Sequence, residues 1–276
     1  MNKVVSKEFY SEDVARLEIE APRIAKSRRA GHFVILRIDE KGERIPLTIA
    51  SSDTEKGTIT LVVQRVGVTS RKLTSLEPGD TITDLVGPLG QATDIHNVGT
   101  VLACGGGVGV APLLPIVEAN KKAGNKVISI IAARSKDLII LEDQIREYSD
   151  EVIVMTDDGS YGEKGLITEG MEKVIRREKV DEAVIIGPAI MMKFAAEVTR
   201  KHNIPSMASL NTIMVDGTGM CGACRVTVDG KTKFVCVDGP EFDAHKVDFD
   251  EMLKRLNGYK DFEKEADAYY RSQQNK

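Results

Sequence analysis

The sequence carries no excess of positive charge and no strongly basic run. Lysine and arginine number 38 and aspartate and glutamate 42, so the formal net charge is -4, with both signs interspersed along the 276 residues. Nucleic-acid-binding domains usually show a basic patch or stripe, and we therefore expect no nucleic-acid partner. The N-terminus alternates apolar and polar residues and includes acids, which argues against a secretory signal peptide.

Long apolar runs are also lacking, apart from one uncharged stretch. Residues 98–117 carry no charge and are long enough to cross a bilayer. They contain five glycines together with Pro112 and Pro115. A strand, a glycine turn and the start of a helix explain this composition better than one spanning helix, so we expect no membrane association.

Cysteine is scarce, and its scarcity bears on the compartment. The chain has four cysteines and shows no secretion signal, which predicts a protein of the reducing cytoplasm without a disulfide framework. Cys104 lies in an apolar run and is interpreted as a small buried residue. The apolar fraction of 42% and charged fraction of 29% are those of a soluble globular protein, and the length suffices for two domains and an appendage.

The first hundred residues predict a small antiparallel β-barrel. Short runs rich in β-branched residues alternate apolar and polar side chains, and Gly, Pro and Asp separate them. A short helix is expected at residues 70–76, because Pro78-Gly79 follows it. The expected strands cover residues 4–10, 14–20, 32–39, 45–50, 58–66 and 81–87.

From residue 98 onward, apolar strands alternate with amphipathic helices, which predicts a parallel sheet covered on both faces. The strands lack period-two alternation, as expected where both faces are buried. Expected strands cover 100–104, 126–133, 151–156, 182–187 and 206–210, and expected helices cover 113–124, 141–149, 167–178 and 190–202. We place the parts at 1–97 (barrel), 98–210 (α/β domain), 211–245 (cysteine-rich loop region) and 246–276 (polar tail), with a helix at about 249–270 that packs on its own chain or contacts a partner subunit.

Three glycine-bearing loops follow strands of the predicted parallel sheet, at residues 105–112, 156–165 and 187–192. Ligands of such sheets bind at the carboxyl ends of the strands, where glycines let the backbone approach a pyrophosphate. Carboxylates in the second loop are suited to ribose hydroxyls; tight turns without a ligand are the alternative. The candidate nucleotide-binding residues are Gly105, Gly106, Gly107, Val108, Gly109, Asp157, Asp158, Gly187, Pro188 and Met191.

Hydroxyl side chains mark a second candidate site, in the barrel. The Thr48 hydroxyl, in a predicted strand, is suited to hydrogen-bond the edge of a planar ring. Thr69 and Ser70 stand at the start of the short helix, where hydroxyls and free N–H groups can bind phosphate. The alternative is that they only cap the helix.

The most specific motif is the cysteine loop, residues 215–236. Cys221, Cys224 and Cys236 have the spacing C-x2-C-x11-C, which is one ligand short of a [2Fe–2S] site. Plant-type sites use C-x4-C-x2-C and a distant Cys, and the same x4 gap counted back from Cys221 leads to Asp216. A carboxylate carries the charge of a thiolate and can bind iron, so the predicted ligands are Asp216 and the three cysteines.

Three alternatives remain open for this loop. Asp216 can start an Asp-Gly turn without binding a metal. The three cysteines can bind zinc together with His245. Cys221 and Cys224 can form a redox pair, although such pairs usually open a helix after a strand. The other histidines are scattered and receive no role.

Taken together, these motifs resemble the ferredoxin–NADP reductase superfamily over about residues 1–210. The resemblance rests on RIPLTIAS, VGVTS, VGPLG, GGGVGVAP and GPAIMM, and it implies that the barrel binds FAD and the α/β domain binds a nicotinamide nucleotide. One departure is that the flavin motif Arg-x-Tyr-Ser aligns with Ile45–Thr48, so the arginine is displaced to Arg44 and the tyrosine is absent. The implied flavin-binding residues are Pro46, Leu47, Thr48, Val63, Gly67, Thr69 and Ser70.

With the cysteine loop included, the whole chain is similar to two related groups. One is the electron-transfer subunit of dihydroorotate dehydrogenase, which generally supplies four cysteines. The other is the small (alpha) subunit of NADH-dependent reduced ferredoxin:NADP oxidoreductase, which DGTGMCGACR, with its aspartate in place of a cysteine, resembles more.

The second resemblance implies a cytoplasmic oxidoreductase subunit that exchanges a hydride between NAD(H) and FAD and passes single electrons through a [2Fe–2S] cluster. A larger partner subunit would carry another FAD and [4Fe–4S] clusters, handle NADP(H) and ferredoxin, and perform electron bifurcation. Such hydride transfer needs aligned rings and no general acid or base, so no catalytic residue is predicted. The alternatives are the dihydroorotate dehydrogenase subunit and, in a different class, a zinc-stabilised or redox-sensing binding protein.

Overall fold

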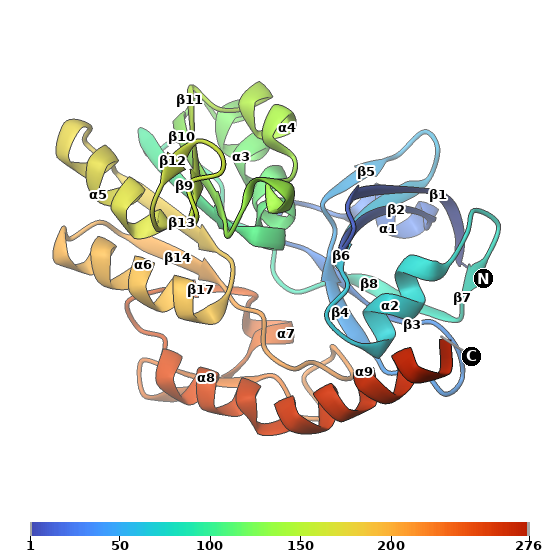
Figure 1. The fold of residues 1–276 in the computed structure, drawn as a ribbon. Coiled ribbons are helices and arrows are strands. Elements are labelled where there is room, and N and C mark those ends of the chain that lie inside the picture. Colours follow the sequence, from blue (N-terminus) through green and yellow to red (C-terminus); the bar gives the residue numbers. More distant parts are fainter. Residues whose placement is uncertain (1, 275–276) are drawn as a thin grey trace.

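The computed structural model describes residues 2–274 and shows the three parts and the tail that the sequence predicts (Figure 1). A β-barrel and an α/β domain stand side by side, the cysteine-rich region lies below the α/β domain in this view, and the tail runs along one side of both (Figure 1). Among the described residues, no helix is both long and apolar enough to span a membrane.

The barrel is built from two antiparallel sheets, with strand orders β5-β6-β2-β1-β7 and β4-β3-β8. Two short helices complete it, and α1 was not predicted from the sequence. Its elements are β1 (Asn2–Ser11), β2 (Val14–Glu20), α1 (Pro22–Ser27), β3 (Phe33–Arg37), β4 (Ile45–Thr48), β5 (Ser51–Asp53), β6 (Thr58–Gln64), α2 (Val68–Ser75), β7 (Thr81–Ile82) and β8 (Asp84–Leu89).

Period-two alternation explains the barrel strands. In β2, Leu17 and Ile19 are fully buried in the barrel core, while Glu18 between them lies on the outer face and pairs with Arg16. Strand β6 departs from this pattern, because all residues from Thr58 to Val63 are buried. Its Val62 side chain belongs to the core of the neighbouring α/β domain, so β6 is buried on both faces.

The α/β domain has one seven-stranded sheet in the order β12-β11-β10-β9-β13-β14-β17. All neighbours are parallel except β17, which pairs antiparallel with β14 at the edge. The strands are β9 (Thr100–Gly106), β10 (Lys126–Ala133), β11 (Glu151–Thr156), β12 (Glu163–Lys164), β13 (Glu182–Ile186), β14 (Ser206–Ser209) and β17 (Glu241–Asp243). The main helices are α3 (Val110–Lys122), α4 (Glu142–Glu147), α5 (Ile167–Arg177) and α6 (Ala189–Lys201).

Helices cover both faces of this sheet, as predicted. Leu113 and Ile116 of α3 pack with one set of strand side chains, together with α4. Met171 of α5 and Met192 of α6 pack with the other set. The strands are therefore apolar throughout, and their carboxyl ends and the following loops are left for ligands.

The cysteine-rich region has more regular structure than the sequence analysis expected. A hairpin of β15 (Arg225–Val228) and β16 (Lys231–Phe234) turns at Asp229-Gly230, and both turn residues have positive φ, the geometry of a type I′ turn. The short helix α7 (Val235–Asp238) carries Cys236. Residues 241–243, which the sequence analysis assigned to this region, form strand β17 and join the α/β sheet, so the region is continuous with that domain's core.

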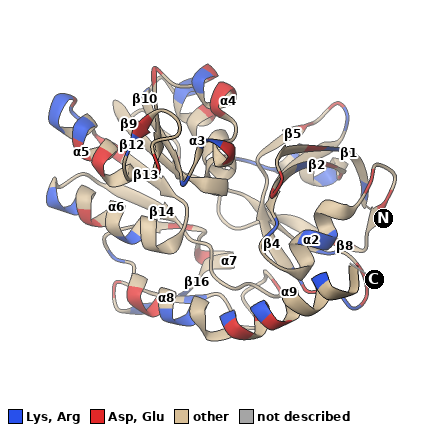
Figure 2. Ribbon diagram, viewed as in Figure 1, with Lys and Arg blue, Asp and Glu red and all other residues tan. Residues whose placement is uncertain are grey.

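The tail forms two helices rather than the single predicted one. They are α8 (Phe249–Leu256) and α9 (Lys260–Gln274), with a 3₁₀ turn at Asn257–Tyr259 between them. Charges of both signs alternate along α8 and α9 (Figure 2), as expected for helices with a large solvent-facing surface. Helix α9 extends from the α/β side to the barrel and lies against α2 (Figure 1).

We expect one ion pair to hold α9 on the barrel. Arg71 Nε lies 2.7 Å from Asp267 Oδ1, with the two side chains only 20% and 13% exposed. The hydrogen bond from Arg71 keeps the pKa of Asp267 below its ordinary value, so docking should persist through the ordinary aspartate range and fail only as the pH falls through that lowered pKa. Asp267→Asn should make α9 several-fold more sensitive to limited proteolysis at neutral pH.

The matched control is Asp261→Asn on the same helix. Its side chain is 92% exposed and reaches only Lys264, at 3.5 Å. This variant should be cut at the wild-type rate, because such exposed pairs contribute little. Equal cleavage of the two variants would show that the Arg71–Asp267 pair does not hold the helix.

Candidate functional site

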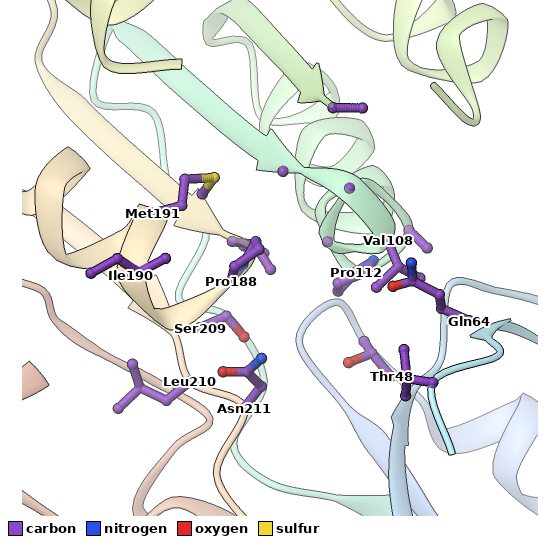
Figure 3. A pocket seen from close by; sticks show the side chains of 18 of the residues that line it. Thr48, Gln64, Val108, Pro112, Pro188, Ile190, Met191, Ser209, Leu210 and Asn211 are labelled. Atoms are coloured by element: carbon purple, nitrogen blue, oxygen red, sulfur yellow. The ribbon is translucent and has the colours of Figure 1, made fainter. Parts of the chain in front are cut away.

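The candidate site is a cleft of about 1590 Å³ between the barrel and the α/β domain. In Figure 3, Thr48 and Gln64 of the barrel lie on one side, and Pro188, Ser209 and Asn211 of the α/β domain lie on the other. The lining is mainly apolar with a few polar groups, the usual character of a cofactor site. Both predicted ligand-binding regions therefore open into one space.

The barrel side of the cleft is formed by β4, the end of β6 and the start of α2. Strand β4 is half-buried, because it pairs with β3 on one side and turns its other surface to the cleft. All seven residues predicted to bind the flavin line the cleft: Pro46, Leu47, Thr48, Val63, Gly67, Thr69 and Ser70. The structure thus brings together a set of residues that are spread over three segments of the sequence.

Hydroxyl groups at the start of α2 already have partners. Ser70 Oγ accepts hydrogen bonds from the backbone N–H of Val66 and of Gly67 and donates to the Gly67 carbonyl, so it caps the helix. Thr69 Oγ1 donates to Glu43 Oε2 at 2.6 Å. The first N–H groups of the helix remain suited to a phosphate, while Glu43 adds a carboxylate to the same side of the cleft.

On the α/β side, the glycine turn after β9 meets the turn after β13. Gly106, Gly107, Val108 and Gly109 line the cleft, whereas the predicted Gly105 does not; it packs against α3 instead. A Cβ atom on Gly109 would lie 2.7 Å from the Ile186 carbonyl oxygen. Gly109 is therefore required for the close approach of the two turns.

The second turn contributes the predicted residues Gly187, Pro188 and Met191, and all three line the cleft. Of the two predicted carboxylates, Asp157 lines the cleft and Asp158 does not. Asp158 Oδ1 instead accepts from the N–H and hydroxyl groups of Ser160, which lowers its pKa, and this is the turn-capping role that the sequence left open.

Several lining residues were not predicted. Ser209 ends β14, and Leu210 and Asn211 follow it. The rule that ligands bind at the carboxyl ends of parallel strands is the signal that would have found these three residues. Glu43, Met214, Glu263 and Ala266 line the cleft through tertiary contacts that no local motif announces.

The cysteine loop brings two of the four predicted ligands into contact. Cys224 Sγ lies 3.3 Å from Cys236 Sγ, and the Cys236 N–H donates to Cys224 Sγ at 3.4 Å. Burial and the Cys224 sulfur raise the pKa of Cys236 to about 12. Cys236 therefore stays protonated unless a metal displaces the proton.

The other two predicted ligands lie in the exposed half of the loop. Asp216 Oδ1 accepts from the Thr218 N–H at 2.7 Å, and Oδ2 accepts from the Cys221 N–H at 2.9 Å, which lowers the pKa of Asp216. Asp216 thus starts a turn, as one alternative expected, and that turn also fixes the backbone of Cys221. Within residues 2–274, no three His, Cys, Asp or Glu side chains converge in a metal-binding arrangement.

His245 is engaged elsewhere. Its Nε2 atom lies 2.9 Å from Thr199 Oγ1 and 3.1 Å from Ser206 Oγ, between α6 and β14. This contact ties the cysteine-rich region to the α/β domain. It gives no support to the alternative in which His245 completes a zinc site with the cysteines.

The residues present fit the predicted flavin, nicotinamide nucleotide and iron–sulfur cluster. The elongated cleft, with its hydroxyl groups and helix start, suits a flavin dinucleotide on the barrel side, and the opposite turns suit a nicotinamide dinucleotide. In the loop, the paired sulfurs of Cys224 and Cys236 and positive φ at Gly217, Gly219 and Gly222 suit an iron–sulfur cluster enclosed by backbone N–H groups.

Comparison with known proteins agrees with these assignments. Residues 1–93 match the oxidoreductase FAD-binding domain, and residues 211–248 match the iron-sulfur cluster binding domain of dihydroorotate dehydrogenase B. FAD and the iron–sulfur cluster are thereby confirmed as cofactors.

Two relatives extend the match over most of the chain. A homologue of the dihydroorotate dehydrogenase B (NAD(+)) electron transfer subunit from Thermotoga maritima is 51% identical over 96% of this chain and 93% of its own length. A probable subunit of the same kind from Methanocaldococcus jannaschii is 38% identical over 72% of this chain and 74% of its own length.

A solved structure of the NADH-dependent reduced ferredoxin-NADP oxidoreductase also matches. Its chain is 49% identical, with a TM-score of 0.93 over 98% of this chain and 97% of that one. This match confirms the predicted fold of barrel, α/β domain, cysteine-rich region and helical tail. The chain therefore belongs to the family of dihydroorotate dehydrogenase B electron-transfer subunits and their homologues, and it is an oxidoreductase subunit that carries FAD and an iron–sulfur cluster.

Proposed function

We propose that the chain is the NAD(H)-handling subunit of an NADH-dependent reduced ferredoxin:NADP oxidoreductase complex. The observation that carries the proposal is that the flavin side and the nucleotide side face each other across one cleft, while the cysteine loop packs on the barrel beside them. The similarity to the solved oxidoreductase over nearly the full chain supports this choice. The flavin would supply the conversion of a hydride into single electrons.

The residues of this chain act by binding and alignment. Thr48 would hydrogen-bond the flavin edge, and Gly187 and Pro188 would hold the nicotinamide opposite it. Hydride transfer between the two rings needs their alignment and no general acid or base. The cleft excludes water through its apolar lining, including Val63, Val108 and Met191 on its two sides.

We propose NAD(H) rather than NADP(H) as the nucleotide. Asp157 lines the cleft after β11, where a carboxylate favours ribose hydroxyls and repels a 2′-phosphate. Arg134, which follows β10, also lines the cleft. The four predicted cluster ligands, Asp216 and the three cysteines, are likewise part of the proposal, as are the part boundaries at residues 97, 210 and 245.

The proposed partner is a larger subunit that carries a further FAD and [4Fe–4S] clusters, handles NADP(H) and ferredoxin, and bifurcates electrons in the cytoplasm. The second candidate is electron transfer to a dihydroorotate dehydrogenase, which the names of the Thermotoga maritima and Methanocaldococcus jannaschii relatives favour. Purification of the complex from its source tests both, because the co-purifying subunit either reduces NADP with ferredoxin or oxidises dihydroorotate. The second outcome would contradict our proposal.

The role of Asp216 can be separated into its two parts. Asp216→Asn keeps an oxygen that can accept from the Thr218 N–H but removes the anionic ligand, whereas Asp216→Cys supplies a thiolate. If Asp216 binds iron, the asparagine variant should lose iron or change its electron paramagnetic resonance spectrum after dithionite reduction. The cysteine variant should keep the cluster with a different spectrum. A wild-type spectrum for Asp216→Asn would show that Asp216 only forms the turn.

The contact between the two α/β turns predicts a nucleotide-binding defect. In Gly109→Ala, the new methyl group would meet the backbone of Ile186 and Gly187, which cannot move as a side chain can. Overpacking of this kind costs about 1–3 kcal/mol, so the dissociation constant for NADH should rise about tenfold. The FAD content, read from the visible absorbance, should stay at the wild-type level, and loss of FAD would show that the defect is a general one.

Replacement of Glu43 should increase the affinity of the protein for FAD. Its carboxylate lies 2.6 Å from the Thr69 hydroxyl, at the helix start where the flavin pyrophosphate would bind. Glu43→Gln removes one repulsive charge, so FAD should bind about fivefold more tightly, or ~1 kcal/mol. Fluorescence titration with FAD measures this change. Glu40→Gln, an exposed change in the same loop, should leave the affinity unaltered, and weaker binding by Glu43→Gln would contradict the assignment of the pyrophosphate site.

A further inference from the structure

The arginine displaced from the usual flavin motif does not face the flavin side of the cleft. Glu43 and Ile45 both line the cleft, but Arg44 between them does not. Arg44 directly precedes β4 (Ile45–Thr48), and its side chain reaches the cysteine loop rather than the cleft. Its Nε atom donates a hydrogen bond to the carbonyl oxygen of Val215 at 2.7 Å. Val215 directly precedes Asp216.

The other end of this contact is anchored in the barrel. Arg44 Nη1 lies 3.7 Å from Asp84 Oδ2 at the start of β8. Asp84 is itself held by Arg37 Nε at 2.6 Å, and Arg37 Nη1 donates to the Glu40 carbonyl. Arg44 therefore joins a small charged network on the barrel to the main chain of the cysteine loop.

The loop has one other close contact with the barrel. Gly217 adopts φ +80°, and a Cβ atom there would lie 2.6 Å from Leu89 Cδ1 and 2.8 Å from Ile35 Cδ1. Beyond Gly217 the loop turns outward, and Met220 is 86% exposed. The position of the exposed half of the loop thus depends on the contacts at residues 215 and 217.

We propose that Arg44 is a positioning residue that ties the cluster loop to the flavin-binding strand β4. It fixes Val215, and through the chain Asp216 and Cys221, relative to Pro46–Thr48 of the adjoining strand β4, which line the cleft. It also places a cation beside a site that gains negative charge on reduction. This inference rests on the proposed role of the loop as the iron–sulfur site.

Two consequences distinguish this role from a merely structural one. Because an adjacent cation stabilises the more negative, reduced state, its removal should lower the midpoint potential of the cluster. Because the hydrogen bond to Val215 holds the loop closed, its loss should let a chelator reach the iron faster. A lysine retains the charge and one donor but not the geometry of the guanidinium.

The test uses the full-length protein with three variants: Arg44→Gln, Arg44→Lys and Arg37→Gln. Arg37 pairs with the same Asp84 but makes no contact with the loop, so Arg37→Gln is the matched control. We expect Arg44→Gln to release iron to a chelator several-fold faster than wild type and to have a lower midpoint potential. Arg44→Lys should regain the potential in large part, and Arg37→Gln should match wild type in both measurements.

Each other outcome is decisive. If Arg44→Gln and Arg37→Gln behave alike, or if Arg44→Gln keeps the wild-type potential and iron-release rate, the inference is wrong while the proposed function stands. A wild-type protein that contains zinc or no iron would instead overturn the proposed role of the loop. If Arg44→Gln fails to fold, the Arg44→Lys variant decides through iron release: faster release than wild type supports the inference, because lysine lacks the guanidinium geometry, and wild-type release contradicts it.

Discussion

One continuous apolar core fixes the three parts of the molecule relative to one another. It contains α/β strand residues such as Leu102 and Ile128, the cysteines Cys224 and Cys236, and two side chains of the barrel strand β3, Phe33 and Ile35. Packed interiors tolerate little displacement, so this shared core keeps the cysteine loop against the barrel. The cleft between barrel and α/β domain, and the position of the loop beside it, both depend on that arrangement.

The same junction contains a carboxyl group at an electrostatic cost. Thr93, in the connection between barrel and α/β domain, donates to Glu241 of β17 at 2.8 Å. Burial, with a contribution from Glu182, raises the pKa of Glu241 to about 7, although the Thr93 hydrogen bond acts in the opposite direction. A raised pKa means that the folded state holds the proton more tightly, so stability here is greatest below the ordinary glutamate pKa and declines as the pH rises toward 7. Close packing at the junction therefore makes ionisation of Glu241 unfavourable.

Local patterns predicted most of the fold. The strand at 126–133 matches β10 residue for residue, and the residues predicted to bind the flavin line the cleft as a set. The hairpin β15–β16 was missed, although Asp229-Gly230 between β-branched runs is the usual signal for its turn. By contrast, nothing local could assign β17 to the α/β sheet, because that pairing is decided by tertiary contacts with β14.

The residues of the candidate site likewise fall into those that local patterns could predict and those that they could not. Residues whose role depends on backbone geometry, such as Gly109 and Gly187, were recognisable from their motifs, because glycine is required where two turns approach closely. Residues whose role depends on where a side chain turns were not. Glu43 and Arg44 are neighbours in the sequence, yet the Glu43 side chain turns to the cleft and the Arg44 side chain to the cysteine loop.

The spacing of the cysteine loop identifies Asp216 as a candidate ligand, but it does not decide whether Asp216 forms a turn, binds iron or does both. The spacing places an acid where plant-type sites have a cysteine, and the fold uses both of its oxygens to hold the Thr218 and Cys221 N–H groups. A carboxylate with two oxygens and about four acceptor positions has capacity for these bonds and for a metal. The hydrogen bonds lower the pKa of Asp216 and so keep it anionic, which is the state that a metal ligand requires. The turn and the proposed ligation are therefore compatible, and the turn orients the carboxylate that the cluster would need.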